Sequence, residues 1–266
     1  MEKISEQHPA APILEMLDVS LASPQNPEEP ILENINWRVQ RGDYWVIAGL
    51  HGSGKSDLIF TAAGLQNPLR GTVNLFGRDI SHLKEKDLLR ERLRIGVVFE
   101  NGGRMFNRLT VAENIALPLR YHENGTPAEI EQRLQEILEL TDLTSLSENM
   151  PSVISPSWQQ RVGLARALAL QPEILLLDKP FIGLELRHRK WWLDFLADLS
   201  RGISFTKNQP MTLVVTTDDL PLWMQQGNQF AVLKKKRWQV LGGRAELKEK
   251  PFLHDLELES EEEIKN

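Results

Sequence analysis

The sequence predicts an α/β fold in which helices cover a mainly parallel sheet. Four short, largely apolar segments, at 44–48, 95–99, 174–177 and 212–216, are typical of strands that are buried on both faces. Segments with helical periodicity lie between them, and this alternation favours parallel strands joined by crossover helices. Residues 34–40 instead alternate polar with apolar side chains, which predicts a half-buried strand and an antiparallel β region near the N-terminus.

The N-terminal half supplies most of the predicted strands. Residues 13–48 are expected to be mainly strands, with a loop at 23–27 where serine, proline and asparagine gather. Residues 57–63 are compatible with a helix. The segment 72–75, followed by a turn at Gly77, predicts a further hairpin.

A helix-rich insertion is predicted at about 107–158. Thr126 is expected to cap a helix there, with Pro127 at the first helical position and Glu129 returning a hydrogen bond to the cap. The apolar stripe of this helix consists of Ile130, Leu134, Ile137 and Leu138. A second helix is predicted over 159–170.

The domain organisation predicted from these elements is simple. We expect a single domain over 13–250, with the helical insertion inside it. A flexible N-terminus is expected over 1–12, and an acidic tail over 251–266 that is frayed from 257 onwards.

The composition excludes several classes of protein. The chain has 266 residues, of which 41% are apolar and 26% charged, which suits a domain with a sizeable core. The net charge of −6 does not favour a nucleic-acid surface. Cysteine is absent, which excludes disulfides and thiolate metal sites. No apolar run approaches the ~20 residues of a membrane span, and the polar N-terminus is unlike a signal peptide, so a cytoplasmic protein is expected.

The most specific motif is a phosphate-binding loop. Residues 49–56 match the pattern G-x-x-x-x-G-K-[ST], with an apolar strand before them and a helix after them. The glycines let backbone N–H groups surround phosphate oxygens. Lys55 supplies a positive charge for the outer phosphates, and Ser56 offers its hydroxyl to Mg²⁺. The candidate nucleotide-binding residues are Gly49, Leu50, His51, Gly52, Ser53, Gly54, Lys55, Ser56 and Asp57. His51 occupies a position that the motif leaves free, so no catalytic role is assigned to it.

Two further landmarks follow this loop. After Ser155, residues 159–169 read Q-Q-R-V-G-L-A-R-A-L-A, and residues 175–178 read L-L-L-D. In this order the three landmarks resemble those of the ATP-binding subunit of ABC transporters, over residues 13–245. Residues 99–114 and 180–184 look most like the phospholipid-transport branch of that family, which serves Mce-type and lipid-asymmetry systems.

The resemblance implies an ABC ATPase type of fold on a P-loop NTPase core, with ATP and Mg²⁺ as ligands. It implies that two ATP-binding subunits pair head to tail, as a homodimer or a heterodimer. It also implies that each subunit docks a transmembrane permease subunit near residues 100–106. Such a subunit is cytoplasmic and peripheral at the cytoplasmic face of the inner membrane. No nucleic-acid partner is expected.

Three positions depart from the residues that the family uses for catalysis. Asp178 matches the aspartate that organises Mg²⁺, but Lys179 stands where the next residue is a glutamate that polarises the attacking water. An ammonium cannot accept a proton. Thr217 stands in place of a histidine that contacts the γ-phosphate, and Glu100 in place of a glutamine that touches Mg²⁺ or water. The candidate metal ligands, acting through the nucleotide, are Ser56, Asp178 and Glu100.

The signature loop of the family, L-S-G-G-Q, is also altered. It corresponds to Ile154 and the residues after it, of which the candidate site residues are Ser155, Pro156, Ser157, Trp158 and Gln159. Pro156 has no N–H to donate to a phosphate. No aromatic residue lies near Ser23, where the family stacks one on adenine, and Asp57 replaces a usual threonine.

Three functions remain open at this point. The chain is an energising ATPase of a transporter that binds MgATP, with hydrolysis expected to be weak or absent because of these replacements, or it is a structural or regulatory pseudo-ATPase that pairs with an active paralogue. A phosphate-loop small-molecule kinase is a poorer alternative, because it leaves the segment 159–169 unexplained. Glu100 and Lys179 are expected to form an ion pair, or to contact Mg²⁺ and phosphate respectively when ATP is bound. The basic runs at 187–190 and 234–237 are expected to be a helix start and a hairpin turn.

Overall fold

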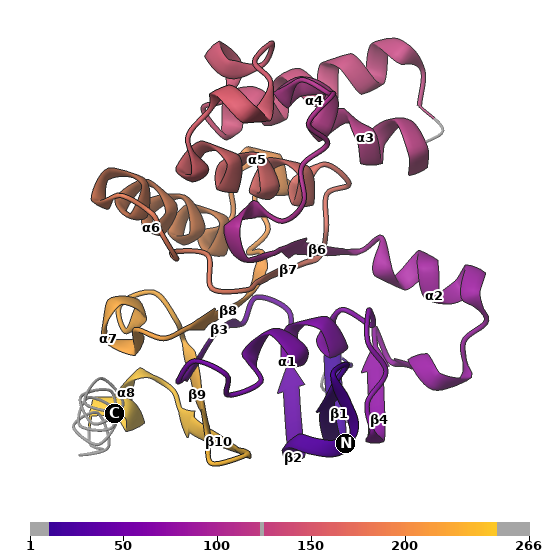
Figure 1. Cartoon of the computed structure of the whole chain (residues 1–266), viewed down its shortest axis with the longest axis vertical. Helices are drawn as coiled ribbons and strands as arrows, with labels where there is room; N and C mark the ends of the chain where they lie inside the picture. The colour runs from indigo at the N-terminus through magenta and orange to yellow at the C-terminus, as the bar shows by residue number, and fades with distance from the viewer. Residues whose placement is uncertain (1–10, 123–124, 249–266) are drawn as a thin grey trace, which may run out of the picture.

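The structure, a computed structural model, describes residues 11–122 and 125–248. Within them, ten strands form one sheet in the order β5-β4-β1-β2-β10-β9-β3-β8-β7-β6 (Figure 1). The predicted termini, 1–12 and 251–266, lie almost wholly outside the described residues. None of the helices in the described part of the chain is long and apolar enough to cross a bilayer.

One half of the sheet is parallel, as predicted. Its strands are β3 (Tyr44–Gly49), β6 (Ile95–Val98), β7 (Ile174–Leu177), β8 (Thr212–Thr217) and β9 (Gln229–Lys234). Each pairs in parallel with its neighbours in the order β9-β3-β8-β7-β6. Every residue of β3, β7 and β8 is buried, which explains their nearly continuous apolar sequences. The predicted fold class is confirmed.

The other half of the sheet is antiparallel. It contains β1 (Leu14–Ser23), β2 (Asn26–Val39), β4 (Arg70–Leu75) and β5 (Arg78–Asp79). The alternation over residues 34–40 is confirmed, since Ile35, Trp37 and Val39 are buried and the residues between them exposed. The loop predicted at 23–27 was too long: Ser23 pairs with Asn26, so a two-residue turn joins β1 to β2.

The C-terminal hairpin joins the two halves. Strand β10 (Arg237–Gly242) pairs antiparallel with β9 and touches β2 at Arg237 and Glu33. Lys235 and Lys236 form the turn with positive φ angles of 50° and 63°. Such angles suit a two-residue turn whose twist matches that of the strands. The predicted hairpin at 234–237 is confirmed, and a short helix, α8 (Arg244–Lys248), follows it.

Helices cover both faces of the parallel strands. Helix α1 (Lys55–Ala62) packs between them and the antiparallel strands, in a core that includes Leu58 and Ile59. On the opposite face, α6 (Leu186–Arg201) and α7 (Leu220–Trp223) bury Trp192 and Trp223 against β3 and β8. Helix α2 (Glu85–Arg92) lies after β5. The remaining short turns are η1 (Ile80–His82), η2 (Glu100–Gly102), η3 (Thr144–Leu146), η4 (Pro151–Val153) and η5 (Ser204–Thr206).

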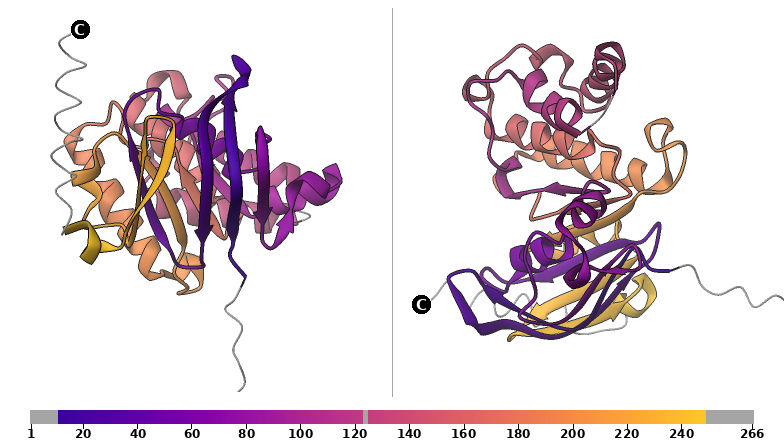
Figure 2. Two further views of the ribbon diagram at one scale, coloured as in Figure 1. Left: turned by 90° about the horizontal axis from the view of Figure 1, so that it is seen from below. Right: turned by 90° about the vertical axis from the view of Figure 1, so that its right-hand side faces the viewer.

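A helical region lies at the end of the molecule opposite the antiparallel strands (Figures 1 and 2). It contains α3 (Val111–His122), α4 (Pro127–Leu140) and α5 (Pro156–Leu168), which share a core of their own. The predicted capping box is present, with Thr126 accepting from the Glu129 N–H and Glu129 accepting from Thr126. The stripe residues Leu134, Ile137 and Leu138 are buried, while Ile130 is only partly buried.

Two predicted helix starts were wrong. Helix α1 begins at Lys55 rather than at residue 57, because the phosphate loop runs directly into the first helical turn. Helix α5 begins at Pro156 rather than at residue 159. Proline suits this first position, since a helix has no acceptor for the N–H there. The signature loop at 154–159 is therefore largely the first turn of α5.

A close backbone contact ties the helical region to the sheet. A β-carbon placed on Gly163 of α5 would lie 2.6 Å from the carbonyl oxygen of Gly102, in the turn that follows β6. Arg166, also on α5, donates to the carbonyls of Arg104 and Gly102 at 3.0 and 3.4 Å. The segment after β6 therefore lies directly on α5, and neither can shift without the other.

Substitution of Gly163 by alanine should destabilise the protein, although alanine favours helices more than glycine does. The added methyl group meets backbone atoms that cannot rotate away, and such overpacking costs roughly 1–3 kcal/mol. Urea denaturation measures the change. The control, Glu131→Ala on the exposed face of α4, should change the free energy of unfolding by less than about 0.5 kcal/mol. Equal stability of Gly163→Ala and the wild type would refute the tight contact.

Candidate functional site

The phosphate loop connects β3 to α1 in a conformation that its glycines permit. Gly52 and Gly54 have φ angles of 74° and 88°, in the left-handed region that other residues rarely adopt. A β-carbon on Gly49 would lie 2.5 Å from the Ser53 hydroxyl oxygen. The first N–H groups of α1 have no acceptor within the helix and are directed towards the loop. The loop therefore fits a phosphate chain.

Lys55 is buried and surrounded by oxygen atoms. Its ammonium donates to the carbonyls of Gly49 and Leu50, each at 2.6 Å, and lies 3.4 Å from the Ser53 hydroxyl. It also forms an ion pair of 2.7 Å with Asp218, which directly follows β8. Burial lowers the pKa of Lys55, and the hydrogen bond and charge of Asp218 oppose this effect. Asp218 was not singled out from the sequence.

Asp178 lies directly after β7, where the sequence predicted a metal-organising carboxylate. It is almost fully buried, and the Thr216 hydroxyl donates to its Oδ1 at 2.9 Å. Thr216, on the adjacent strand β8, also accepts from the Lys179 N–H at 3.0 Å. It fixes the orientation of both residues at this edge of the sheet.

Lys179 and Glu100 form the ion pair that the sequence predicted. Lys179 has a positive φ of 44°, and Glu100 begins the short turn after β6. Burial disfavours the charged form of Lys179. The hydrogen bond that Lys179 donates to Glu100 and the nearby carboxylates of Asp178 and Asp218 outweigh this effect, so that the pKa of Lys179 is raised. Lys179 therefore stays protonated and cannot act as a base near neutral pH.

Thr217 ends β8, and its hydroxyl is used locally. It accepts from the Asp219 N–H at 3.0 Å and donates to the Asp219 carbonyl at 3.2 Å. Asp219 in turn caps α7, because its carboxylate accepts from the Leu222 N–H at 3.2 Å. A hydroxyl held in this way lacks the reach and the basicity of a histidine.

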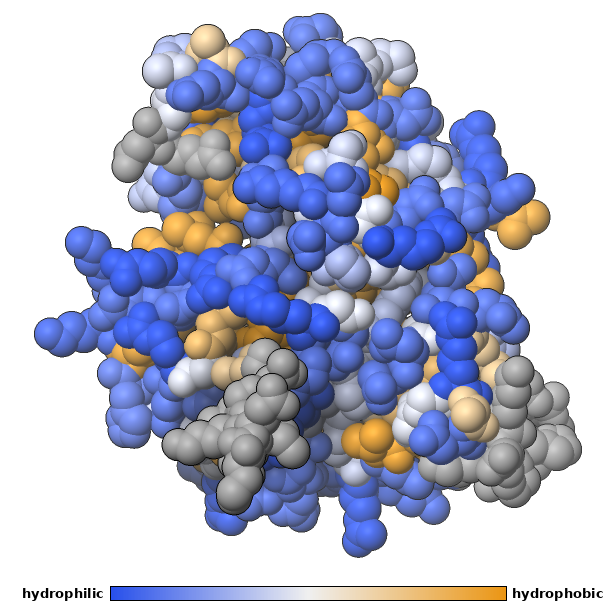
Figure 3. Space-filling model, turned by 180° about the vertical axis from the view of Figure 1, so that it is seen from behind, coloured by the Kyte–Doolittle hydropathy of each residue, from blue (hydrophilic) through white to orange (hydrophobic). Residues whose placement is uncertain are grey.

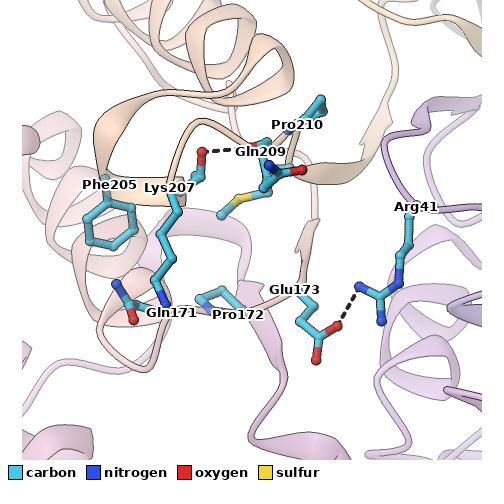
Figure 4. Close-up of a pocket in the computed structure, with 10 residues that line it drawn as sticks. Arg41, Gln171, Pro172, Glu173, Phe205, Lys207, Gln209 and Pro210 are labelled. Atoms are coloured by element: carbon cyan, nitrogen blue, oxygen red, sulfur yellow. Dashed lines mark hydrogen bonds and ion pairs between the residues drawn. The ribbon is translucent and has the colours of Figure 1, made fainter.

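Two cavities lie at opposite ends of the parallel strands. One, of about 290 Å³, is at the carboxyl ends and is lined among others by Lys179, Arg189, Thr217, Asp218 and Trp223. The other, of about 230 Å³, lies at the amino ends, where Arg41 pairs with Glu173 and Lys207 extends towards Gln171 (Figure 4). Open α/β sheets bind ligands at their carboxyl ends, so the first cavity belongs to the site and the second does not.

The candidate metal ligands lie near the phosphate loop and at the ends of β6 and β7. Among the described residues, no three His, Cys, Asp or Glu side chains are grouped as metal ligands. Ser56 and Asp178 provide a hydroxyl and a carboxylate oxygen, which suit Mg²⁺ when phosphate oxygens complete its shell. Glu100 is engaged by Lys179 and would have to leave this ion pair to contact a metal. Asp57, at the start of α1, is half-buried, and burial raises its pKa.

The signature residues form the first turn of α5. Ser155 is the residue before the helix, and Gln159 donates to the carbonyls of Pro151 and Ile154 at 2.9 and 3.2 Å. Trp158 contacts the buried His188 edge-on, with ring centroids 5.0 Å apart. The sequence indicated Trp158 only as a replacement within the signature loop.

An arginine held between two indoles lies behind this turn. The Arg161 guanidinium is 4.4 Å from the Trp158 ring centroid and 3.7 Å from that of Trp191, and 3.2 Å from His188 Nδ1. Burial lowers the pKa of Arg161 to about 10, although Asp142 opposes it. The basic run at 187–190 does start helix α6, as predicted, but the sequence did not indicate that His188 would be buried.

Comparison with known proteins agrees with this site. The ABC transporter family matches residues 32–182, which include the phosphate loop, the signature turn and Asp178. The chain belongs to the ABC transporter family. As an ABC cassette, it has the antiparallel strands, parallel core and helical region expected from the sequence resemblance.

Several curated relatives are importer subunits. The chain is 34% identical to the sulfate/thiosulfate import ATP-binding protein CysA of Synechococcus elongatus, over 88% of this chain and 64% of that protein. It is 34% identical to the methionine import ATP-binding protein MetN of Lacticaseibacillus paracasei, over 76% of this chain and 55% of that protein. The chain thus spans less than two thirds of the length of these relatives.

A solved ABC cassette shares the fold closely. The ATP-binding cassette MJ0796, in a dimeric post-hydrolysis state bound to ADP and Pi, matches with a TM-score of 0.75 and 28% identity. The match covers 86% of this chain and 99% of that one. CbiO1 of Clostridium perfringens, part of the CbiONQ transporter complex, matches with a TM-score of 0.76 over 90% of this chain and 92% of that one. Its identity of 22% supports the fold alone.

The buried His188 should make stability depend on pH. Burial, followed by the charges of Arg161 and Arg187, lowers its pKa, while Glu185 opposes them. The unfolded chain therefore takes up a proton near pH 6.5 while the folded chain does not, so stability falls as pH drops below that value. Denaturation between pH 7.5 and 5.5 should show a shallower slope for His188→Gln, by at most about 1.4 kcal/mol per pH unit. His122→Gln, at an exposed histidine, should keep the wild-type slope; equal slopes for all three proteins would refute the expectation.

Proposed function

We propose that the protein is the ATP-binding subunit of an ABC transporter that binds MgATP through the phosphate loop and hydrolyses it weakly or not at all. A single contrast carries the proposal. The loop around Lys55 is complete and correctly folded, whereas the position after Asp178 holds the protonated Lys179 instead of a proton acceptor. The loop that would bind the phosphates is retained, whereas the groups that the family uses to cleave ATP are replaced.

The remaining groups cannot easily substitute for the missing base. Glu100 is an alternative carboxylate at this edge, but it is paired with Lys179. Thr217 is committed to the Asp219 backbone. Loss of one group that stabilises a transition state commonly costs about 3–4 kcal/mol of barrier, and groups that act together fail together.

Lys179 and Glu100 are proposed to hold the nucleotide instead. The Lys179 side chain is 11% exposed at the carboxyl edge of the sheet, beside Asp178 and near Lys55. When ATP binds, its ammonium exchanges Glu100 for a γ-phosphate oxygen, and Glu100 faces Mg²⁺. This exchange keeps every charge paired and stabilises a bound, uncut nucleotide.

A second ATP-binding subunit and a permease are the proposed partners. MJ0796 supports the dimer, because it is dimeric in its structure with ADP and Pi. The exposed Phe106, close to the Glu100 turn, supports permease contact at that place. The face of the molecule on the far side of Figure 1 is mainly hydrophilic, and its apolar side chains lie in separate patches (Figure 3). Binding to a permease would place the protein at the cytoplasmic face of the inner membrane. The proposed domain organisation is a single nucleotide-binding domain over 13–250.

The alternative function is a purely structural or regulatory pseudo-ATPase paired with an active paralogue. It is favoured by Pro156, which removes an N–H from the surface that would face the partner's nucleotide.

The proposed substrate is lipid-related, and the sequences at 99–114 and 180–184 support it. The named relatives support import of sulfate or methionine instead. Copurification with a lipid-transport permease would favour the lipid assignment.

Lys55→Ala should remove nucleotide binding. Isothermal titration should show MgATP binding to the wild type and a loss of at least about 30-fold in affinity in the variant, since a charge-assisted phosphate contact is worth roughly 2 kcal/mol or more. Lys207→Ala, at the other end of the strands, should bind like the wild type. Absence of wild-type binding at millimolar MgATP would make the loop a relic and favour the purely structural function.

Steady-state ATP hydrolysis should lie far below that of an ordinary cassette, by about 100-fold or more. Lys179→Glu alone should not restore it, because the new carboxylate lies beside Glu100 and the altered Thr217 and signature turn remain. The double variant Glu100→Gln, Lys179→Glu removes that repulsion and tests the remaining groups. Robust wild-type turnover that disappears in Lys55→Ala would overturn the proposal.

A further inference from the structure

The ammonium of Lys55 has no donor to spare. A lysine ammonium carries three N–H donors, and three oxygen atoms lie within 2.7 Å of it: the carbonyls of Gly49 and Leu50 and the carboxylate of Asp218. A phosphate oxygen can reach this ammonium only by displacing one of them. The question is which of the three is displaced.

Asp218 is the partner that can leave. The two carbonyls belong to the phosphate loop itself, whose path is fixed by Gly52 and Gly54. The Asp218 side chain is 45% exposed, whereas that of Lys55 is 3% exposed, so the carboxylate can turn towards water while the ammonium cannot. The neighbouring cavity of about 290 Å³, which Asp218 lines, gives it room.

The structural role at the start of α7 belongs to Asp219 and not to Asp218. Asp219, and not Asp218, accepts from the Leu222 N–H and caps α7. The Asp219 backbone also makes both hydrogen bonds of the Thr217 turn, since its N–H donates to the Thr217 hydroxyl and its carbonyl accepts from it. Asp218 is therefore free of the capping role, and its carboxylate is aimed at Lys55.

We propose that Asp218 is an internal competitor for nucleotide. Its carboxylate occupies the place beside the Lys55 ammonium that a phosphate oxygen would take, and it thereby sets the affinity of the site for nucleotide. This inference rests on the proposed function, since it assumes that the loop binds nucleotide. The carboxylate and the phosphate are alternatives, because one buried ammonium cannot satisfy two anions that also repel each other.

The same contact explains how a buried lysine remains charged without phosphate. An unpaired buried ammonium is costly, and burial does lower the pKa of Lys55. The hydrogen bond and the charge of Asp218 oppose this effect of burial and favour the protonated form of Lys55. The consequence is a lower affinity, because binding must first break an ion pair of 2.7 Å.

The test compares Asp218→Asn with Asp219→Asn. Both substitutions remove one carboxylate from the same turn, but only the first removes the competitor. MgATP and MgADP affinities are measured by isothermal titration for both variants and the wild type, with circular dichroism to verify folding. We expect Asp218→Asn to bind both nucleotides about tenfold more tightly, as loss of a competing charged hydrogen bond predicts. Asp219→Asn should remain within about twofold of the wild type.

The outcomes separate this inference from the proposed function. Wild-type binding with equal or weaker binding by Asp218→Asn overturns the competitor and leaves the nucleotide-binding function intact. Binding by Asp218→Asn where the wild type shows none supports the competitor. Binding by neither protein at millimolar nucleotide overturns both. If Asp218→Asn fails to fold, Asp218→Ser takes its place with the same expected tightening. Equal tightening by Asp219→Asn would assign the effect to general negative charge and overturn the specific role of Asp218.

Discussion

The pairing of parallel strands that are buried on both faces is the constraint on which the whole site depends. Strands β3, β8, β7 and β6 lie side by side and end at the same edge of the sheet. Their buried backbone groups must pair with one another, and that requirement fixes the register between neighbours. The residues that follow each strand are consequently brought together: the phosphate loop after β3, Asp218 after β8, Asp178 and Lys179 after β7, and Glu100 after β6.

This edge concentrates charge around two largely buried lysines. Lys55 and Lys179 supply two cations, and the three nearby carboxylates belong to Asp178, Asp218 and Glu100. Each lysine is satisfied by one carboxylate at the end of a neighbouring strand, and Asp178 is oriented by the Thr216 hydroxyl. A triphosphate entering such a site exchanges with these internal pairs. The free energy of binding is therefore the difference between the contacts that the triphosphate makes with the lysines and the internal ion pairs that it replaces. This difference is smaller than the free energy of either set of contacts.

The helical region is joined to this edge by packing and not by flexible linkers alone. The Gly102–Gly163 contact places the turn after β6 against α5. The Arg161 guanidinium, between Trp158 and Trp191, links the signature turn to α6. The turn that begins at Glu100 therefore packs directly against the start of α5, where a β-carbon on Gly102 would lie 2.6 Å from the carbonyl oxygen of Gln159.

Local rules allowed much of the protein to be predicted from sequence. The apolar strands, the capping box at Thr126, the hairpin at 234–237 and the phosphate loop depend on residues close in the chain, and the structure reproduces them. The errors at residues 23–27, at the start of α1 and at the start of α5 are boundary errors, where proline and glycine are compatible with both a loop and a first turn.

The resemblance to a known family located Glu100 and Lys179 as neighbours, and the structure contains their ion pair. Three contacts were not predicted: the ion pair between Asp218 and Lys55, the hydrogen bond from Thr216 to Asp178, and the edge-on contact of His188 with Trp158. Each joins segments far apart in the chain, and in sequence each is an ordinary polar residue beside a strand or helix. By itself the sequence determined which segments become strands and helices, and which chemical groups are present or missing, because these follow from local spacing and composition. Only the tertiary structure decided which charges face one another, because that depends on the order of the strands and on how far each side chain is removed from water.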